Sequence, residues 1–356
     1  MTYLKHKKAF DSSDTGSNAM LSSPGMEPRH DSVLVKEVLK ALAVQPGDTV
    51  VDATLGGAGH FKALLAELGE GGVIVGIDAD RSAVERGREA YAADRRPERP
   101  VAHLVNDNFR NLARILERLG IGHVDAMLFD LGWSGFQIAA PRGFSFQNDE
   151  PLLMNYSEQS PSAGSTELTT GALEAEETAA DIVNSSGETA LADLIFTYGE
   201  ERFARSIARA IVEARSRERI LTTGALVSAI KAGTPKWYHE GRINPATRTF
   251  QALRIAVNDE IGALREGLST ALDSLSPLGR LAVISFHSIE DRMVKNMLRD
   301  AVHAGRGTLS PTKPILPTRL EILANRRARS AKLRVFERSA VHAGPAGSPA
   351  QILSYA

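Results

Sequence analysis

The stretch TVVDATLGGAGH at residues 49–60 indicates how the chain folds. A β-branched run ends at Asp52, a glycine-rich turn follows, and the next residues have the apolar spacing of a helix. A second apolar run, VIVGID at residues 73–78, ends in another acid, Asp78. A strand, a glycine loop, a helix, a strand and an acid in this order are typical of an α/β unit that binds an adenosine-containing cofactor.

Further buried runs continue this alternation along the chain. Residues 101–105, 125–132 and 280–286 have the apolar character of buried strands, and helical segments lie between the strands. Strands that alternate with helices predict a doubly wound parallel sheet, and therefore the α/β fold class. Residues 179–232 have long helical periodicity without strands, so we expect a helical domain inserted into the α/β domain.

Changes in composition along the chain predict its parts. The polar residues 1–28 lack a sustained period, which favours a flexible leader. The segment 157–178 has five Glu, no basic residue and many Ser, Thr and Gly, and we interpret it as a mobile surface loop. The predicted parts are a leader at 1–28, a discontinuous α/β domain at 29–139 and 243–340, a helical insert at 140–242, and a tail at 341–356.

The composition limits the chemistry that the protein performs. The chain has 356 residues and no cysteine, which excludes disulfides, zinc–thiolate sites and a cysteine nucleophile. A formal net charge of −1 means that a nucleic-acid partner needs local basic patches. No run reaches the ~18–20 apolar residues of a membrane span, and the polar start of the chain lacks a secretory signal. We therefore expect a cytoplasmic protein without a membrane partner.

The glycine loop favours one class of cofactor. Its sequence GGAGH differs from the G-x-G-x-x-G pattern of dinucleotide-binding proteins. The carboxylate of Asp52 would repel a pyrophosphate, whereas it suits the cationic amino group and sulfonium of S-adenosylmethionine. Asp78 is placed to accept the two hydroxyls of a ribose. These features favour a methyltransferase over a dehydrogenase, and a tight turn with Asp78 as a helix cap is the structural alternative.

A second candidate site follows the buried run at 125–132. The sequence DLGWS lies at the carboxyl end of a predicted central strand, where open α/β sheets bind ligands. An acid followed three residues later by an aromatic resembles the arrangement in amino-group methyltransferases of this fold. The acid would hold the hydrogens of an exocyclic amine, and the aromatic would stack on an extruded base. We therefore predict Asp130, Trp133 and Ser134 as catalytic residues, with core packing of Trp133 as the alternative.

Longer motifs extend this similarity to one family. DATLGGAGH, DLGWSGFQ, RGFSF, PATRTFQALRIAVNDE and RLAVISFHSIEDRMVK resemble stretches of the RsmH/MraW family, the bacterial 16S ribosomal RNA cytosine-N4 methyltransferases. The similarity covers about residues 29–338. It implies a class I (Rossmann-like) methyltransferase core with an inserted helical domain for substrate recognition. It also implies S-adenosylmethionine as the methyl donor and, as the acceptor, a cytosine of the decoding centre in the small ribosomal subunit.

The loop and the resemblance together predict the cofactor contacts. The predicted cofactor-binding residues are Asp52, Gly57, Ala58, Gly59, His60, Asp78, Phe109, Asp130 and Gln137. Ala58 departs from the family pattern, which has a glycine there, and adds about 1 kcal/mol of strain if its φ is positive. DLGWSGFQ and EPLLMNYS also depart from the usual family sequences. Two alternatives therefore stay open: a non-catalytic rRNA-binding assembly factor, and an amino-methyltransferase that acts on another nucleic acid.

Basic residues gather near the end of the chain. Residues 313–338 contain eight Lys or Arg and two Glu, which favours a phosphate-binding surface whose affinity falls as salt rises. Arg248 and Arg254 of PATRTFQALR are expected to line the cleft instead. The predicted contacts to 16S rRNA are Arg248, Arg254, Arg326, Arg327, Arg329 and Lys332. Pairing of the basic stretch with the acidic insert is the alternative.

A helix predicted at 200–217 also carries regularly spaced arginines. Arg202, Arg205 and Arg209 lie on one side of it, opposite apolar residues. This side is either a surface for RNA or an ordinary solvated face, because several Glu partly neutralise it.

A polar group follows the strand predicted at 280–286. His287, Glu290 and Asp291 together have the side chains of a metal site, but methyl transfer needs no metal. We therefore expect no metal and interpret the three residues as a network that shapes the substrate site. The oligomeric state stays open between a monomer and a homodimer.

Overall fold

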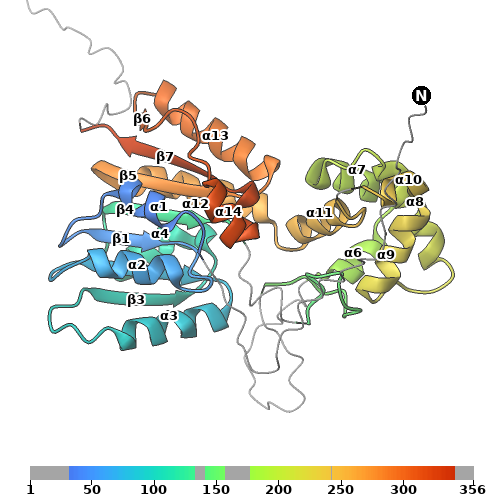
Figure 1. Ribbon diagram of the computed structural model, residues 1–356, viewed down its shortest axis with the longest axis horizontal. Coiled ribbons are helices and arrows are strands. Elements are labelled where there is room, and N and C mark those ends of the chain that lie inside the picture. The colour runs from blue at the N-terminus through green and yellow to red at the C-terminus, as the bar shows by residue number, and fades with distance from the viewer. Residues whose placement is uncertain (1–31, 133–140, 157–176, 242, 341–356) are drawn as a thin grey trace, which may run out of the picture.

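The computed structural model describes residues 32–132, 141–156, 177–241 and 243–340. Within these residues, seven strands form one sheet in the order β3-β2-β1-β4-β5-β7-β6 (Figure 1). Strands β1 to β5 are parallel, whereas β7 runs antiparallel between β5 and β6. The strands are β1 Thr49–Asp52, β2 Val73–Asp78, β3 Val101–Asn106, β4 Val124–Asp130, β5 Leu275–Ser285, β6 Gly307–Leu309 and β7 Lys332–Arg338. This topology confirms the predicted α/β, class I (Rossmann-like) methyltransferase fold.

Helices cover both faces of the sheet. Those on the first face are α1 Val35–Leu42, α2 Gly59–Glu67 and α3 Arg81–Ala93. Those on the second face are α4 Leu112–Leu119, α12 Glu260–Ser274 and α13 Ser288–His303. Because successive residues of a strand point to opposite faces, Val50 joins the first core and Val51 joins the second. The central strands are therefore apolar on both sides, as the continuous apolar runs of the sequence predict.

The sequence pattern does not predict β6 and β7, because charged residues interrupt the apolar run KLRVFER. In the structure, Leu333 and Val335 face the first core, and Phe336 packs into the second. Arg334, which lies between Leu333 and Val335 along the strand, is also buried, and its Nε donates to Oδ1 of Asp291 at 2.8 Å. The partner that permits burial of this charge lies on α13, so no local pattern reveals it.

A second group of helices lies beside the sheet, and most of them share a third core (Figure 1). Its members are α6 Ala179–Ser185, α7 Glu188–Gly199, α8 Ala204–Arg215, α9 Thr223–Ala232, α10 Lys236–His239 and α11 Thr247–Val257. α11 buries Phe250 and Leu253 in this core. The predicted division before residue 243 stays a prediction, and the packing of α11 favours a boundary after that helix. Neither these helices nor the others in the described ranges combine the length and hydropathy of a membrane-spanning segment.

Phe336 gives a direct test of the packing of β7. Its side chain is 1% exposed, and Phe336→Ala is expected to lower the free energy of unfolding by about 3–5 kcal/mol because it empties a close-packed site. Urea denaturation followed by circular dichroism measures this loss. Phe196→Ala is the control: Phe196 is 64% exposed, so the loss should stay below about 1 kcal/mol. Equal losses in the two variants would contradict the described packing.

Candidate functional site

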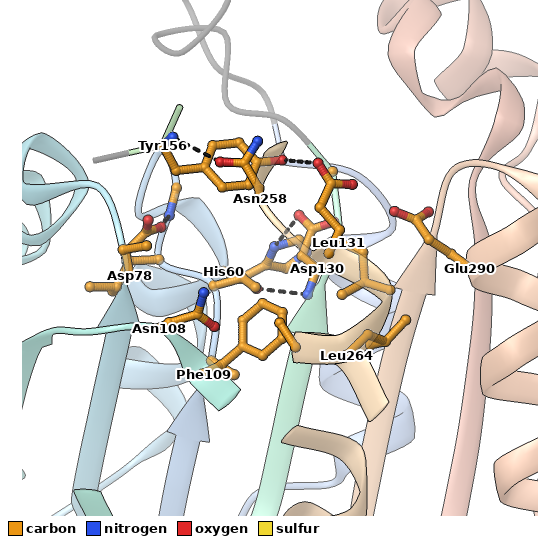
Figure 2. A pocket seen from close by; sticks show the side chains of 18 of the residues that line it. His60, Asp78, Asn108, Phe109, Asp130, Leu131, Tyr156, Asn258, Leu264 and Glu290 are labelled. Atoms are coloured by element: carbon orange, nitrogen blue, oxygen red, sulfur yellow. Dashed lines mark hydrogen bonds and ion pairs between the residues drawn. The ribbon is translucent and has the colours of Figure 1, made fainter. Parts of the chain in front are cut away.

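A pocket opens at the carboxyl ends of β1, β2 and β4 (Figure 2). Parallel strands present their carboxyl ends at one edge of a sheet, so side chains that follow different strands meet there. The β1–α2 loop and the residues after β2, β3 and β4 form one wall, and α12 with the segment at Tyr156 forms the other. The predicted cofactor-binding residues that line this pocket are Gly57, His60, Asp78, Phe109 and Asp130.

Asp52 lies behind this wall, at the end of β1. It is 0% exposed, and its Oδ1 accepts a hydrogen bond from the backbone N of Thr54 at 3.2 Å. Its Oδ2 is buried without a hydrogen-bond partner among the described residues. Burial raises the pKa of Asp52 to about 7, although the nearby His60 lowers it. Asp52 does not line the pocket, so its predicted role toward a cofactor stays a prediction and would depend on its charge without direct contact.

Asp78 ends β2 and faces the pocket. Its Oδ2 accepts from the backbone N of Gly56 at 2.8 Å, and its Oδ1 accepts from the backbone N of Asp80 at 2.8 Å. Burial raises the pKa of Asp78 to about 6, while these backbone hydrogen bonds lower it. The cap of α3 is Asp80, so the structural alternative of Asp78 as a helix cap is wrong. Asp78 ties the glycine loop to β2, and its oxygens keep lone pairs for further donors.

His60 and Asp130 form a buried pair. His60 Nε2 lies 2.9 Å from the carbonyl oxygen of Val33, and His60 Nδ1 lies 3.3 Å from Oδ2 of Asp130. A carbonyl oxygen only accepts, so Nε2 carries a hydrogen, and the contact at Nδ1 then requires a second proton between imidazole and carboxylate. Burial lowers the pKa of His60, but the hydrogen bond and charge of Asp130 and the charge of Asp52 raise it more. The pair therefore holds a shared proton.

The other oxygen of Asp130 remains available for a ligand. Asp130 Oδ1 is buried without a hydrogen-bond partner among the described residues, although the backbone N of Asp130 donates to Oγ1 of Thr54 at 2.7 Å. Arg327, in the short helix Arg326–Ser330, approaches this carboxylate: burial lowers the pKa of Arg327, and the charge of Asp130 raises it. Asp130 Oδ1 therefore has no partner within the described part of the chain, and the positive charge of Arg327 lies near it.

The glycine loop turns sharply between Gly56 and Gly59. Ala58 has a φ of +60°, so the condition for strain at this position is met, at about 1 kcal/mol. Gly59 is required for a different reason, because a Cβ there would lie 2.1 Å from Oγ of Ser32. Gly57 and Ser32 line the pocket, whereas Ala58 is buried and Gly59 packs against Ser32.

An apolar slot lies beside these polar groups (Figure 2). Phe109 packs edge-on against Phe129, with ring centroids 5.5 Å apart and an interplanar angle of 75°. Leu264 of α12 lines the same pocket. Gly267 of α12 leaves room for the ring, since a Cβ there would lie 2.9 Å from Cδ2 of Phe109. A flat apolar slot next to a carboxylate suits an aromatic base joined to a ribose.

A hydrogen-bonded network forms the opposite wall. Tyr156 Oη donates to Oε1 of Glu260 at 2.7 Å, and Arg254 Nη2 donates to Oε2 of Glu260 at 2.8 Å. Asn258 Oδ1 accepts from the backbone N of Tyr156 at 3.0 Å. Burial and the charge of Glu260 raise the pKa of Tyr156 well above its ordinary value, so its hydroxyl stays a donor. Arg254 is 5% exposed, and this burial against Glu260 argues against its predicted contact with RNA.

The polar residues at the start of α13, His287, Glu290 and Asp291, contact two different parts of the structure. His287 Nε2 lies 3.0 Å from Oε1 of Glu290, and Glu290 lines the pocket. Asp291 is one residue further round the helix and pairs with β7: its two oxygens lie 2.8 Å from Lys332 Nζ and from Arg334 Nε. Asp291 therefore ties α13 to β7 and does not belong to a network at the pocket, which corrects that part of the prediction.

One group near the pocket has the composition of a metal site. Ligand atoms of Glu260, His287 and Glu290 lie within 4.8 Å of one another. Arg254 Nε lies 2.6 Å from Oε1 of Glu260, so a guanidinium already neutralises that carboxylate. A divalent cation would have to compete with this buried ion pair. The expectation that no metal takes part stays a prediction.

The remaining residues predicted to bind RNA, including Lys332 with its ion pair to Asp291, do not line the pocket. Arg326 and Arg329 are exposed, and Arg327 lies close enough to Asp130 for that charge to raise its pKa, although burial lowers it more. Arg248 is partly buried, and its Nη1 donates to the carbonyl oxygen of Glu200 at 2.8 Å. Their contact with RNA stays a prediction.

Several predicted features fall outside the described residues. Trp133, Ser134 and Gln137 lie in the stretch 133–140, so their positions relative to Asp130 are not described. The leader at 1–28, the tail at 341–356 and all but the last two residues of the loop 157–178 also lie outside.

The sequence pattern does not point to part of the pocket wall. Ser32 precedes the first helix, and Tyr156 lies in the segment before the acidic loop. Asn258 and Glu260 lie at the junction of α11 and α12, where the polar triplet NDE between two helices is the local signal. These residues reach the pocket only through the tertiary fold. Because they are far from the glycine loop in the sequence, the sequence pattern does not predict that they line the pocket.

Asp52 predicts a pH dependence of stability. The pKa of Asp52 rises from an ordinary 3.8 in the unfolded chain to about 7 in the folded protein. Between these two pH values the native state binds more protons than the unfolded state, so the free energy of unfolding falls as pH rises. Asparagine does not ionise, so the variant Asp52→Asn avoids the cost of the buried charge. The free energy of unfolding of the variant minus that of the wild type is therefore expected to be larger at about pH 8 than at about pH 5. Urea denaturation at both pH values measures this. The same stability difference at both pH values would contradict the raised pKa.

Comparison with known proteins identifies relatives of this chain. The model of the MraW methylase family matches residues 27–339. A ribosomal RNA small subunit methyltransferase H of Deinococcus radiodurans is 46% identical over 318 residues, which cover 88% of this chain and 91% of that protein. The protein of the same name from Brevibacillus brevis is 41% identical over 330 residues, which cover 87% of this chain and 98% of that protein.

The assignment rests on these sequence matches. A solved structure of an rRNA methylase from Streptococcus thermophilus aligns with 86% of this chain and 93% of its own, at 11% identity and a TM-score of 0.36. Likeness at that level carries no argument about function. The family model, in contrast, spans both segments of the sheet and the helices between them. The chain therefore belongs to the MraW methylase family.

Proposed function

We propose that the protein transfers the methyl group of S-adenosylmethionine to the N4 amino group of a cytosine in 16S ribosomal RNA. Asp78 and the His60–Asp130 pair, beside the apolar slot of Phe109, carry this assignment. The relatives named as small subunit methyltransferases support ribosomal RNA as the acceptor. The choice of a cytosine in the decoding centre follows the resemblance of the motifs around Asp130.

The described residues fit this cofactor. Asp78 would accept the ribose hydroxyls through its remaining lone pairs, and Phe109 with Leu264 would pack on the adenine. Asp52 Oδ2 and Asp130 Oδ1 are buried without partners among the described residues, and their negative charge would attract the cationic sulfonium and amino group of the cofactor. The cofactor supplies an activated methyl group, so the protein needs to provide alignment more than a strong base.

The acceptor amine is held by Asp130. Its Oδ1 would accept a hydrogen from N4 and direct the nitrogen lone pair toward the methyl carbon. A bound donor would supply the methyl carbon, whose bond to sulfur would break as its bond to nitrogen forms, and Asp130 Oδ1 would take up the proton that leaves the amine. The proton shared with His60 stays on Nδ1 and faces Oδ2, so it fixes the plane of the carboxylate and leaves Oδ1 able to accept the proton of the amine. His60 is therefore a positioning residue that acts through Asp130.

The intact site favours catalysis over a purely structural role in ribosome assembly. A binding protein without turnover would not need a proton shared between His60 and Asp130 in a cavity. Arg327 lies close enough to Asp130 to feel its charge, and Arg327 with Arg326 and Arg329 of the same short helix would hold phosphates of the RNA around the target nucleotide. We place this activity in the cytoplasm, on the small ribosomal subunit.

Asp130→Asn tests the assigned reaction. Small subunits from cells that lack the enzyme are incubated with the protein and S-adenosylmethionine with a labelled methyl group, and mass spectrometry of the 16S rRNA locates the label. The variant is expected to lose at least about 100-fold in kcat, because its amide no longer takes up the proton of the amine. Asp193→Asn, at an exposed carboxylate of α7, is the control with unchanged activity. Label on duplex DNA in a parallel reaction but none on the 16S rRNA, or full turnover by Asp130→Asn, would overturn the proposal.

His60→Asn tests the positioning role. The shared proton leaves as pH rises through the pKa of His60, which lies above its ordinary value, so the kcat of the wild type should fall on the alkaline side. The amide of asparagine still donates to Asp130 but does not titrate, so the variant should have a lower kcat without this alkaline decline. Steady-state kinetics over a pH series measure both. An alkaline limb of the same shape in the two proteins would contradict the role of the shared proton.

A further inference from the structure

The turn between α7 and α8 and the short helix α10 bring an arginine against three aromatic rings. The guanidinium carbon of Arg202 lies 4.9 Å from the ring centroid of Phe203, 4.9 Å from that of Trp237 and 5.2 Å from that of Tyr238. The rings meet edge to face, with centroids 4.9 Å apart for Phe203 and Tyr238 and 5.9 Å apart for Phe203 and Trp237. Trp237 nevertheless stays 59% exposed.

A buried carboxylate holds this aromatic group in place. Glu201 is 0% exposed, its Oε1 accepts from the backbone N of Phe203 at 2.9 Å, and its Oε2 accepts from Oη of Tyr238 at 2.6 Å. Burial and Glu201 raise the pKa of Tyr238 to about 12, so its hydroxyl stays a donor. The neighbours of Trp237 are therefore fixed before any partner arrives, which lowers the entropy lost on binding.

The surface around Trp237 is cationic. Arg202 and Lys236 are exposed, and within the described ranges neither forms an ion pair. The charge of Arg248 is close enough to lower the pKa of Tyr238. An exposed indole flanked by guanidinium and ammonium groups matches a partner that has negative charge and flat aromatic rings, which is the chemistry of unpaired RNA.

This surface is joined to the helix that borders the pocket. Glu200, in the same turn as Arg202, accepts a hydrogen bond from the hydroxyl of Ser288 and pairs with an arginine of α13. Ser288 begins α13, and Glu290 in the next residues lines the pocket. An RNA strand that leaves the pocket past Glu290 would therefore meet the turn that carries Arg202 and, beside it, Trp237.

We propose that Arg202 and Trp237 form a platform on which an unpaired base of the RNA, flanking the target nucleotide, stacks. The platform presupposes the ribosomal RNA substrate proposed above and names where the helical insert holds that RNA. The indole of Trp237 carries the base, and the guanidinium of Arg202 contacts the neighbouring phosphate. A protein of the small subunit is the other class of partner, and the measurements below separate the two.

Fluorescence tests the platform without any methyl transfer. The chain has two tryptophans, so the full-length Trp133→Phe protein reports on Trp237 alone. A short oligocytidine RNA is expected to quench this emission, because a stacked base quenches indole. Heparin is the control, since it has the negative charge but no bases and should leave the emission unchanged. No quenching by RNA, or equal quenching by heparin, would overturn the platform whether or not the protein methylates ribosomal RNA.

Substitution tests its contribution to substrate binding. Trp237→Ala is expected to raise KM for unmethylated small subunits, and Kd for the oligocytidine, about tenfold with kcat nearly unchanged, because one base–aromatic stack is lost. Trp237→Phe keeps an aromatic face and should recover most of the loss. Phe196→Ala, at another exposed aromatic of the insert, should leave both constants unchanged. A higher KM for subunits with unchanged binding of oligocytidine would assign the surface to a protein partner and overturn the RNA platform.

Discussion

The carboxylates at the ends of β1, β2 and β4 place buried negative charge at one edge of the sheet. β1 pairs in parallel with both β2 and β4, so the topology brings Asp52, Asp78 and Asp130 together. Burial raises the pKa of Asp52 and of Asp78, which shows that ionising them in this setting is unfavourable. His60 supplies the compensating proton within the group. A site of this kind is stabilised by a ligand that brings its own positive charge.

The surrounding structure keeps this charge in place. The carbonyl of Val33 holds His60 with its second nitrogen toward Asp130, and the left-handed backbone at Ala58 turns the loop into α2. The polar wall around Glu260 comes from the junction between the helical insert and the α/β domain. The insert therefore contributes to the pocket as well as carrying the proposed surface for the RNA, and Glu200 ties that surface to α13 through Arg292.

The sequence predicts site residues whose positions follow from local secondary structure. It does not predict residues whose positions depend on tertiary contacts. Asp78 and Asp130 are predictable because strand ends in a parallel sheet share one edge. Arg254 has the pattern of a cleft-lining arginine, yet the turn from α11 to α12 buries it against Glu260. Asp291 adjoins Glu290 in the sequence, but the helical rotation of one residue directs it to β7. The partner of Arg254 is set by the turn between two successive helices, and the partners of Asp291 are set by the packing of α13 on β7.

Calorimetric titration of the protein with S-adenosylmethionine and with S-adenosylhomocysteine, in buffers of different ionisation enthalpy near neutral pH, tests the role of the buried charge most directly. The two ligands differ in the sulfonium charge. We predict that binding of S-adenosylmethionine releases protons from the protein, because the positive charge of the ligand lowers the raised pKa values of Asp52 and Asp78. Binding of S-adenosylhomocysteine, which lacks this charge, should release fewer protons. Failure to bind S-adenosylmethionine, or equal proton release by both ligands, would contradict a pocket whose buried carboxyl groups favour a positively charged ligand.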